Sequence, residues 1–227
     1  METSLHRELK LLYADRHARV EVPVAGYRID ALDGDWLVEI QHGSLAAIRD
    51  KVRKLLTKHQ VLVVKPLIAR KTLVRRRKKG GAVASRRVSP KRAGLLNLFD
   101  ELVYFTRVFP HPRLAIHVVL VEVEEWRYPG HGRRRRWREN DFIVEDQKLL
   151  AVGESVRIAT TADLWRMMPP SLPRPFHTGH LAESLGFQRW IAQRIAYCLR
   201  KTGTVREVGK QGNARMYERA KEATAAA

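Results

Sequence analysis

Two carboxylates and one amide stand at a spacing that could hold a divalent metal ion. Glu39 and Gln41 are two residues apart, so on a strand their side chains point to the same face. Asp33-Gly34 is a strong hairpin signal, and a turn there would bring Asp30 beside Glu39. Carboxylate oxygens suit Mg²⁺, which activates water and neutralises charge on a transition-state phosphate. The pattern points to hydrolysis of a phosphodiester.

Local patterns predict the elements that position these residues. Leu5, Leu9 and Leu12 recur at helical spacing, and Thr3 or Ser4 can cap that helix. Alternating apolar residues then indicate strands, and a later apolar stripe indicates a second helix. The predicted order is a helix over 4–14 whose Glu8 could approach the hairpin, strands over 19–24, 27–32 and 36–41, a helix over 45–58 capped by Ser44, and an all-apolar strand over 61–64.

The positive charge is concentrated in two acid-free segments. The chain has 227 residues and a formal charge of +19. Twelve Lys and Arg lie between Lys65 and Arg92 and five between Arg133 and Arg138, and without these seventeen charges only +2 would remain. Such runs favour contact with a polyanion, most simply nucleic acid. The predicted phosphate contacts are Lys71, Arg75, Arg76, Arg77, Lys78, Lys79, Arg86, Arg87, Arg133, Arg134, Arg135 and Arg136.

The middle of the chain is less regular. A strand over 67–77 is expected to lead into a basic loop that ends at Pro90. A helix over 95–108, a long strand over 114–126, a Gly- and Arg-rich loop over 128–140 and a further strand over 142–156 follow. The four prolines of residues 167–175 indicate a linker or a rigid bracket.

The C-terminal part looks like a helix-turn-helix with a wing. Helices are predicted over 161–168, 178–185 and 188–201, with a turn at Gly186, and a hairpin over 204–219 resembles the wing. Residues 1–158 and 159–221 would then form two domains. Such modules bind DNA or serve as protein–protein units. The predicted DNA contacts here are Gln188, Arg189, Gln193, Arg194, Lys210 and Arg215.

Glu8, the segment Tyr27–Asp30 and the segment Glu39–Gln41, in this order of elements, resemble the PD-(D/E)xK nuclease superfamily, which includes Holliday-junction resolvases and many restriction endonucleases. The resemblance covers residues 4–66 and implies an α/β fold with a restriction endonuclease-like core. It also implies that Asp30, Glu39 and the backbone carbonyl of Ile40 bind Mg²⁺ or Mn²⁺, and that Glu8 supports the site or a second metal ion.

Gln41 departs from this family, which usually has Lys at that place. Gln can orient a water molecule but lacks the positive charge of Lys, which Lys51 or Lys54 could supply. Two functions therefore stay open. One is a metal-dependent DNA endonuclease with a catalytic set of Glu8, Asp30, Glu39 and Gln41. The other is a non-catalytic DNA-binding protein or transcriptional regulator with a degenerate nuclease core.

Several classes of protein are disfavoured. No apolar run approaches the ~18 residues of a membrane span. The N-terminus lacks the apolar core of a signal peptide, and the single cysteine, Cys198, excludes an intramolecular disulfide. We expect a soluble cytoplasmic protein that binds duplex or branched DNA, with RNA as the alternative polyanion and homodimer formation left open.

Overall fold

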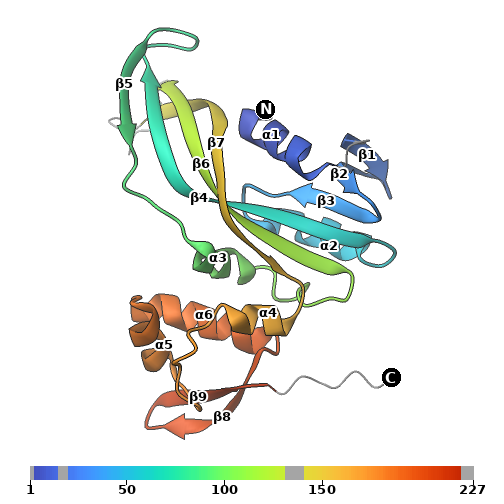
Figure 1. The fold of residues 1–227 in the computed structure, drawn as a ribbon, viewed down its shortest axis with the longest axis vertical. Helices are drawn as coiled ribbons and strands as arrows, with labels where there is room; N and C mark the ends of the chain where they lie inside the picture. Colours follow the sequence, from blue (N-terminus) through green and yellow to red (C-terminus); the bar gives the residue numbers. More distant parts are fainter. Residues whose placement is uncertain (1–2, 15–19, 131–140, 221–227) are drawn as a thin grey trace. The chain divides into compact units, whose positions relative to one another are not determined.

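The chain folds as a mixed α/β protein with a predominantly β core and several helices. The computed structural model describes residues 3–14, 20–130 and 141–220 (Figure 1). Its elements are α1 (Ser4–Tyr13), β1 (Val20–Val24), β2 (Tyr27–Asp33), β3 (Trp36–Ile40), the 3-10 helix η1 (Leu45–Ile48), α2 (Arg49–Leu55), β4 (Gln60–Arg76), β5 (Val83–Val88), the 3-10 helix η2 (Leu95–Asn97), α3 (Leu98–Leu102), β6 (Leu114–Pro129), β7 (Phe142–Ile158), α4 (Thr161–Arg166), α5 (Thr178–Leu185), α6 (Arg189–Lys201), β8 (Val205–Gln211) and β9 (Ala214–Arg219).

The described residues form two compact units. The first contains residues 3–14, 20–42, 64–95, 118–130 and 141–156, and the second contains residues 43–63, 96–117 and 157–220. The domain boundary predicted between residues 158 and 159 stays a prediction. Within the described part of the chain, no helix is long and apolar enough to cross a membrane.

One large sheet carries most of the strands. Its neighbours follow the order β1-β2-β3-β4-β6-β7, and β5 pairs with β4 outside this path. β8 and β9 form a separate two-stranded sheet. The predicted hairpin is confirmed: β2 and β3 are antiparallel, Asp33 pairs with Trp36, and Gly34 takes the left-handed φ of 54° that a tight turn needs.

The first helix, α1, is predicted almost to the residue. The side chain of Thr3 caps it, and Leu5 and Leu9 are buried. Leu12 was expected among these buried residues but is 59% exposed. The buried residues of the helix are Leu5, Leu9 and Lys10. The helix packs against β2 and β3.

The chain around the second helix was predicted as one helix over 45–58. Ser44 does accept a hydrogen bond from the N–H of Ala46, but the segment opens with η1 before α2 begins. The expected buried stripe is present at Leu45, Val52 and Leu55.

The strand predicted over 61–64 is part of a longer strand. β4 runs without interruption from Gln60 to Arg76, and its first residues, Val61 to Val64, are buried as an all-apolar run predicts. The predicted strands over 67–77, 114–126 and 142–156 correspond to the rest of β4, to β6 and to β7.

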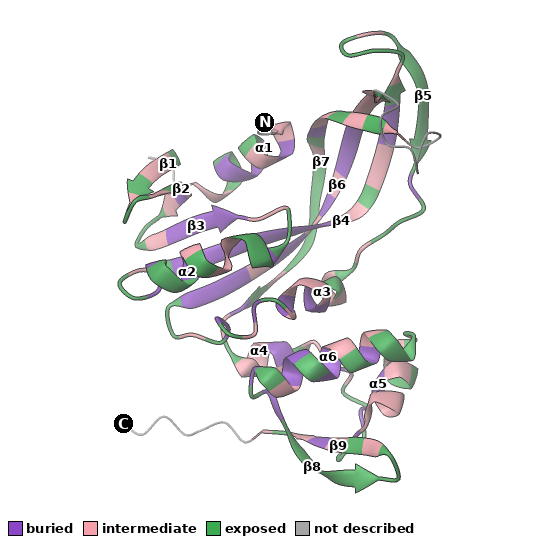
Figure 2. Ribbon diagram, turned by 180° about the vertical axis from the view of Figure 1, so that it is seen from behind, coloured by how far each residue is buried: buried purple, intermediate pink, exposed green. Residues whose placement is uncertain are grey.

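The prediction of a loop between Arg77 and Pro90 was wrong, because β5 forms there and pairs with β4. All residues of β5 are exposed (Figure 2), so backbone hydrogen bonds rather than burial hold this strand. A strand without a buried face leaves no hydrophobic alternation in the sequence.

The helix predicted over 95–108 was also too long. The chain forms η2 and the short α3, then continues in turns to Val108. Val103, Tyr104, Phe105 and Thr106 are β-branched or aromatic and favour helix weakly. Phe105 is nevertheless fully buried, because the turns direct it into the core.

The C-terminal elements appear in the predicted order. α4, α5 and α6 are followed by the antiparallel pair β8–β9. Gly186 ends α5 with a left-handed φ of 64°. Ala192, Ile195 and Leu199 form the buried face of α6.

Candidate functional site

Asp30 and Glu39 lie on the same face of the β2–β3 hairpin. Ala31 pairs with Val38, so the next step of the register sets Asp30 opposite Glu39. The Glu39 residue is only 4% exposed. The sequence prediction that these two carboxylates are neighbours on one sheet face therefore agrees with the register of the strands.

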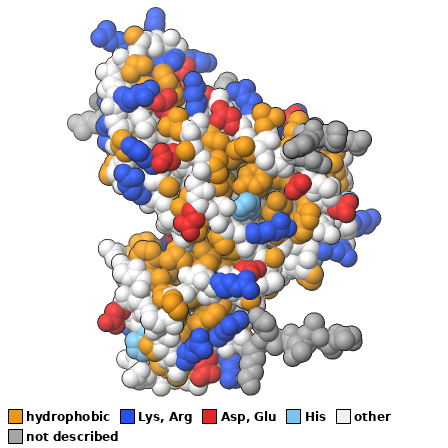
Figure 3. All heavy atoms as spheres, in the orientation of Figure 1, with side chains coloured by type: hydrophobic (Ala, Val, Ile, Leu, Met, Phe, Trp, Pro, Cys, Tyr) orange, Lys and Arg blue, Asp and Glu red, His pale blue; other side chains and the backbone are white. Residues whose placement is uncertain are grey.

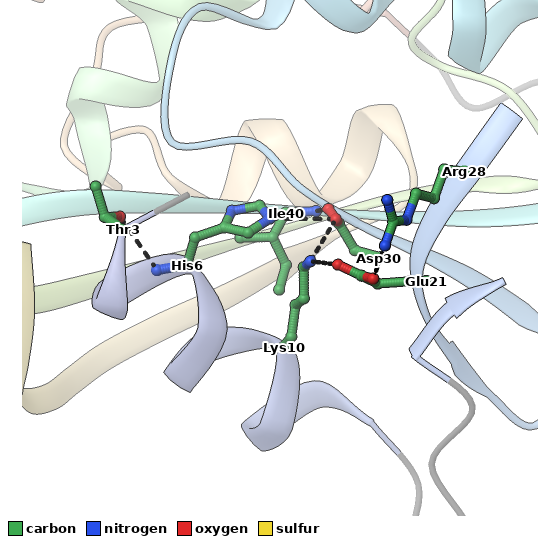
Figure 4. Close-up of polar contacts among 7 residues, drawn as sticks. All are labelled: Thr3, His6, Lys10, Glu21, Arg28, Asp30 and Ile40. Atoms are coloured by element: carbon green, nitrogen blue, oxygen red, sulfur yellow. Dashed lines mark hydrogen bonds and ion pairs between the residues drawn. The ribbon is translucent and has the colours of Figure 1, made fainter. Parts of the chain in front are cut away.

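Both carboxylate oxygens of Asp30 are engaged by groups of the chain itself (Figure 4). Oδ1 lies 3.1 Å from His6 Nε2 and 3.6 Å from Lys10 Nζ. Oδ2 accepts a hydrogen bond of 2.8 Å from the backbone N–H of Ile40. Asp30 thus ties α1 to β2 and β3.

These contacts set the ionisation of Asp30. Burial by itself would raise the pKa of the carboxyl group. Hydrogen bonds from His6 and Ile40, together with the positive charges of His6 and Lys10, outweigh burial and lower the pKa below its ordinary value. Asp30 is therefore held as a carboxylate.

Lys10 is the residue of this site that sequence reasoning missed. Its Nζ atom donates a hydrogen bond of 3.0 Å to Glu21 on β1, and the residue is only 7% exposed. Arg28 on β2 pairs with the other oxygen of Glu21. The available signal was the spacing of His6 and Lys10, which are four residues apart and lie on one helix face.

The other predicted site residues have different surroundings. Glu8 lies two residues from His6, and its Oε2 accepts a hydrogen bond of 3.1 Å from the backbone N–H of Leu149 on β7. The backbone N–H of Gln41 donates to the carbonyl of Val64 on β4 at 2.9 Å. Lys51 and Lys54 both lie on α2, where Lys51 is half-buried and Lys54 is exposed, and α2 belongs to the other compact unit.

The Mg²⁺ or Mn²⁺ site expected at Asp30, Glu39 and Ile40 stays a prediction. Among residues 3–14, 20–130 and 141–220, no three His, Cys, Asp or Glu side chains form a group that could hold a metal ion. Both oxygens of Asp30 already face the donors of His6, Lys10 and Ile40. A metal ion at Asp30 would have to replace these contacts.

Further buried and half-buried polar residues lie in the same compact unit. The Nζ atom of Lys65 donates to the backbone carbonyl of His42 at 3.1 Å. Burial lowers the pKa of His42, and the nearby positive charges of Lys65, Lys71 and His6 lower it further. Lys71 forms an ion pair of 2.8 Å with Glu125 on β6.

The predicted basic segment is the β4–β5 hairpin and its flanks. Lys65 contacts the His42 carbonyl, and four more of its twelve basic residues form ion pairs: Arg70 with Glu122, Lys71 with Glu125, Arg76 with Glu145 and Arg86 with Glu124. The other seven form no ion pair with an acid of the described chain: Arg75, Arg77, Lys78, Lys79, Arg87, Lys91 and Arg92. Arg133, Arg134, Arg135 and Arg136 lie outside the described residues.

The C-terminal candidates divide between exposed and paired positions. Gln188, Arg189 and Gln193 are exposed on or next to α6, whereas Arg194 forms an ion pair with Asp100 on α3. In the β8–β9 hairpin, Lys210 is exposed and pairs in register with Arg215. Arg215 itself forms an ion pair of 3.2 Å with Glu207.

Comparison with known proteins identifies a relative and a family. The chain is 29% identical over 220 residues to an uncharacterized protein of Treponema pallidum (strain Nichols), and the match covers 96% of this chain and 85% of the relative. No solved structure matches the chain. The model of the family described as "Domain of unknown function (DUF8091)" matches residues 3–159, which is more than half of the chain, and the protein therefore belongs to this family.

Proposed function

We propose that this protein binds duplex DNA through its phosphate backbone. The observation that carries the proposal is the surplus of positive charge on the β4–β5 hairpin. Seven of the twelve basic residues between Lys65 and Arg92 have no acidic partner in the described chain, and Figure 3 shows blue side chains gathered around the end of the hairpin. Clustered Lys and Arg without counter-ions attract the phosphates of nucleic acid.

The C-terminal elements support the same function. Three helices followed by a two-stranded hairpin resemble a winged helix-turn-helix, in which the last helix enters the major groove. On α6, Arg189 and Gln193 are exposed, as contacts to phosphates or base edges require. Arg194 is assigned to the Asp100 ion pair instead.

A metal-dependent DNA endonuclease is the second candidate. The observation that favours it is the shared face of Asp30 and Glu39, with the cation of Lys10 3.6 Å from Asp30. The order α1, β1, β2, β3, α2 and β4 also resembles the restriction endonuclease-like core. Against it stand Gln41, which lacks the usual positive charge, and the contacts that occupy Asp30.

Two measurements separate these functions. The first is fluorescence anisotropy of a labelled 20-base-pair duplex at several salt concentrations with EDTA present, with an RNA duplex as competitor. We expect binding that weakens steeply with salt, because released counterions drive phosphate binding. Absence of binding at ~50 mM salt would contradict the proposal, and preferential displacement by RNA would reassign the substrate.

The second measurement is nicking of plasmid and branched DNA with Mg²⁺ or Mn²⁺. The matched variants are Asp30→Asn and Glu39→Gln, which keep the shape of each side chain and remove its charge. Cleavage by the wild type that both variants lose would establish the endonuclease. If the wild type does not cleave DNA and both variants still bind it, the protein is a non-catalytic DNA-binding protein.

A further inference from the structure

The two faces of the β4–β5 hairpin carry different basic residues. Leu73 pairs with Arg87 and Arg75 with Ser85, so Arg75 and Arg87 share one face of the hairpin. Val74 pairs with Arg86, and this pair lies on the opposite face together with Arg70 and Arg76. We call these the Arg75 face and the Arg86 face.

The Arg86 face is neutralised by acids of the neighbouring strands. Arg86 lies 2.8 Å from Glu124 and Arg70 lies 3.8 Å from Glu122, both on β6. The third arginine of this face, Arg76, lies 3.3 Å from Glu145 on β7 and stacks on the ring of Trp126 at 4.4 Å. Its three arginines are therefore already paired.

Glu145 also fixes the end of the hairpin. The Oε1 atom that pairs with Arg76 accepts a hydrogen bond of 3.1 Å from the backbone N–H of Gly80, in the turn between β4 and β5. The hairpin is thus anchored to β7 on its Arg86 face. The anchored face leaves the Arg75 face as the one that presents unpaired cations.

A third arginine, Arg127 on β6, belongs to the Arg75 face. Its side chain is 12% exposed, its guanidinium stacks on the ring of Phe142 at 4.3 Å, and its buried Nε has no hydrogen-bond partner in the described chain. Arg127 lies 4.0 Å from Glu125, which pairs with Lys71, and Lys71 is on the same face of β4 as Arg75. Burial lowers the pKa of Arg127, and the positive charges of Arg87 and Arg75 lower it further.

Among the described residues, Glu125 is the acid that forms an ion pair with this cluster, and it is shared. Glu125 lies 4.0 Å from Arg127 but only 2.8 Å from Lys71, and Gln147 donates a further hydrogen bond to it at 3.0 Å. The cluster therefore carries three positive charges, from Arg75, Arg87 and Arg127, whereas the negative charge of Glu125 is shared with Lys71. Such a cluster is stabilised by an external anion.

We propose that Arg75, Arg87 and Arg127 form a binding site for a phosphate group of the DNA backbone, so that the hairpin engages DNA with its Arg75 face only. This inference rests on the proposed DNA-binding function and adds the face and the residues. Guanidinium groups suit phosphate oxygens because they donate paired hydrogen bonds in a fixed plane. Phe142 holds the Arg127 fork in place before the anion arrives.

The test compares two charge-matched double variants on the same hairpin. Arg75→Gln/Arg87→Gln removes two cations from the Arg75 face, and Arg70→Gln/Arg86→Gln removes two from the Arg86 face. Each variant loses the same net charge, so general electrostatic attraction falls equally. The Kd of the labelled 20-base-pair duplex is measured by anisotropy between 50 and 200 mM salt, and circular dichroism checks that each variant is folded.

The expected result is a loss of about ten-fold in affinity for Arg75→Gln/Arg87→Gln and a salt-dependence slope smaller by about one to two, because one or two phosphate contacts disappear. The Arg70→Gln/Arg86→Gln variant should stay within about two-fold of the wild type with an unchanged slope. Equal losses on both faces, or a larger loss on the Arg86 face, overturn the inference while DNA binding stands. A wild type that binds no duplex overturns the proposed function itself.

A single substitution tests the third member. Arg127→Lys keeps the charge but loses the planar fork and the stacking on Phe142. We expect it to weaken duplex binding about three-fold or more at 50 mM salt, with a slope close to that of the wild type. An affinity equal to that of the wild type would remove Arg127 from the site.

Discussion

The Nζ atom of Lys10 lies 3.6 Å from Oδ1 of Asp30, and the two side chains are 9% and 18% exposed. A cation supplied by the protein's own first helix thus neutralises the carboxylate at which the sequence resemblance places a metal ion. The same ammonium group binds Glu21 on β1. Lys10 therefore joins α1 to β1 and β2 by charge.

Replacing Lys10 should destabilise the fold. Lys10→Met keeps the length and packing of the side chain but leaves Asp30 and Glu21 without their shared cation. We expect the free energy of unfolding in urea to fall by about 1–3 kcal/mol, because the half-buried Asp30 and Glu21 carboxylates each lose one of their positively charged partners. Lys58→Met, at an exposed lysine, is the control and should stay within about 0.5 kcal/mol. A Lys10→Met protein as stable as the wild type would show that the pair contributes nothing net.

Acid should weaken the fold through Asp30. The folded-state pKa of Asp30 is lowered, so its contribution to stability is present above the unfolded value of 3.8 and is lost as pH falls through the folded value. Urea unfolding between pH 6 and pH 2.5 should therefore show a smaller acid-induced loss for Asp30→Asn than for the wild type. Asp33→Asn, at the exposed hairpin turn, serves as the control. The same pH dependence in Asp30→Asn and the wild type would contradict the assignment.

Local signals account for the parts of the fold that the sequence predicts. The Thr3 cap, the Asp33-Gly34 turn and the Gly186 stop each act within a few residues, and each appears where it was predicted. The shared face of Asp30 and Glu39 follows from the turn alone. β5 was not predicted because all its residues are exposed, so its sequence does not alternate between apolar and polar residues. Pairing with β4 stabilises it instead.

The partners of the site residues depend on tertiary packing and could not be predicted. From the sequence, a lysine between Leu9 and Leu11 is expected at the surface. The burial of Lys10 is explained by its contacts with Asp30 and Glu21. Glu8 was placed near Asp30, but it reaches β7, whose position relative to α1 no local pattern encodes. In the same way, the acids that neutralise the Arg86 face lie more than thirty residues away in sequence.

The N-terminus of α5 should respond to pH near neutrality. The Nδ1 atom of His177 accepts hydrogen bonds from the N–H groups of Gly179 at 2.9 Å and His180 at 3.1 Å, which a protonated Nδ1 cannot do. Burial lowers the pKa of His177, and the charges of His180 and Arg189 lower it further. The stabilisation that the His177 cap gives the fold is therefore complete above the unfolded-state pKa of 6.5 and declines as pH falls below that value.

Two variants at the same position test the cap. His177→Ser keeps a capping oxygen that does not titrate, so stability between pH 7.5 and pH 5 should vary less than in the wild type. His177→Ala removes the cap and should cost about 1 kcal/mol at pH 7.5. Thermal or urea unfolding at each pH provides the measurement. If all three proteins share one pH dependence, the capping role of His177 is wrong.

Cys198 should be unreactive until the second compact unit opens. It is the single cysteine of the chain, it is fully buried on α6, and its Sγ lies 3.7 Å from the carbonyl oxygen of Phe99. Burial raises the pKa of the thiol to about 12, and the positive charge of Arg194 offsets only part of this effect. Since the thiolate is the reactive form, a disulfide reagent at pH 8 should modify the folded protein only through opening of the fold.

One core substitution tests whether the rate of Cys198 modification depends on the stability of the fold. Ile195→Ala removes a fully buried side chain next to Cys198 on α6 and should cost about 2–4 kcal/mol. If modification proceeds through opening, the rate should rise by the corresponding factor of about thirty or more, because the open population rises with it. Arg200→Gln, which leaves the buried face of α6 intact, should leave the rate nearly unchanged. Rapid modification of the folded wild type, or equal rates in all three proteins, would mean that the thiol is reached without opening the core.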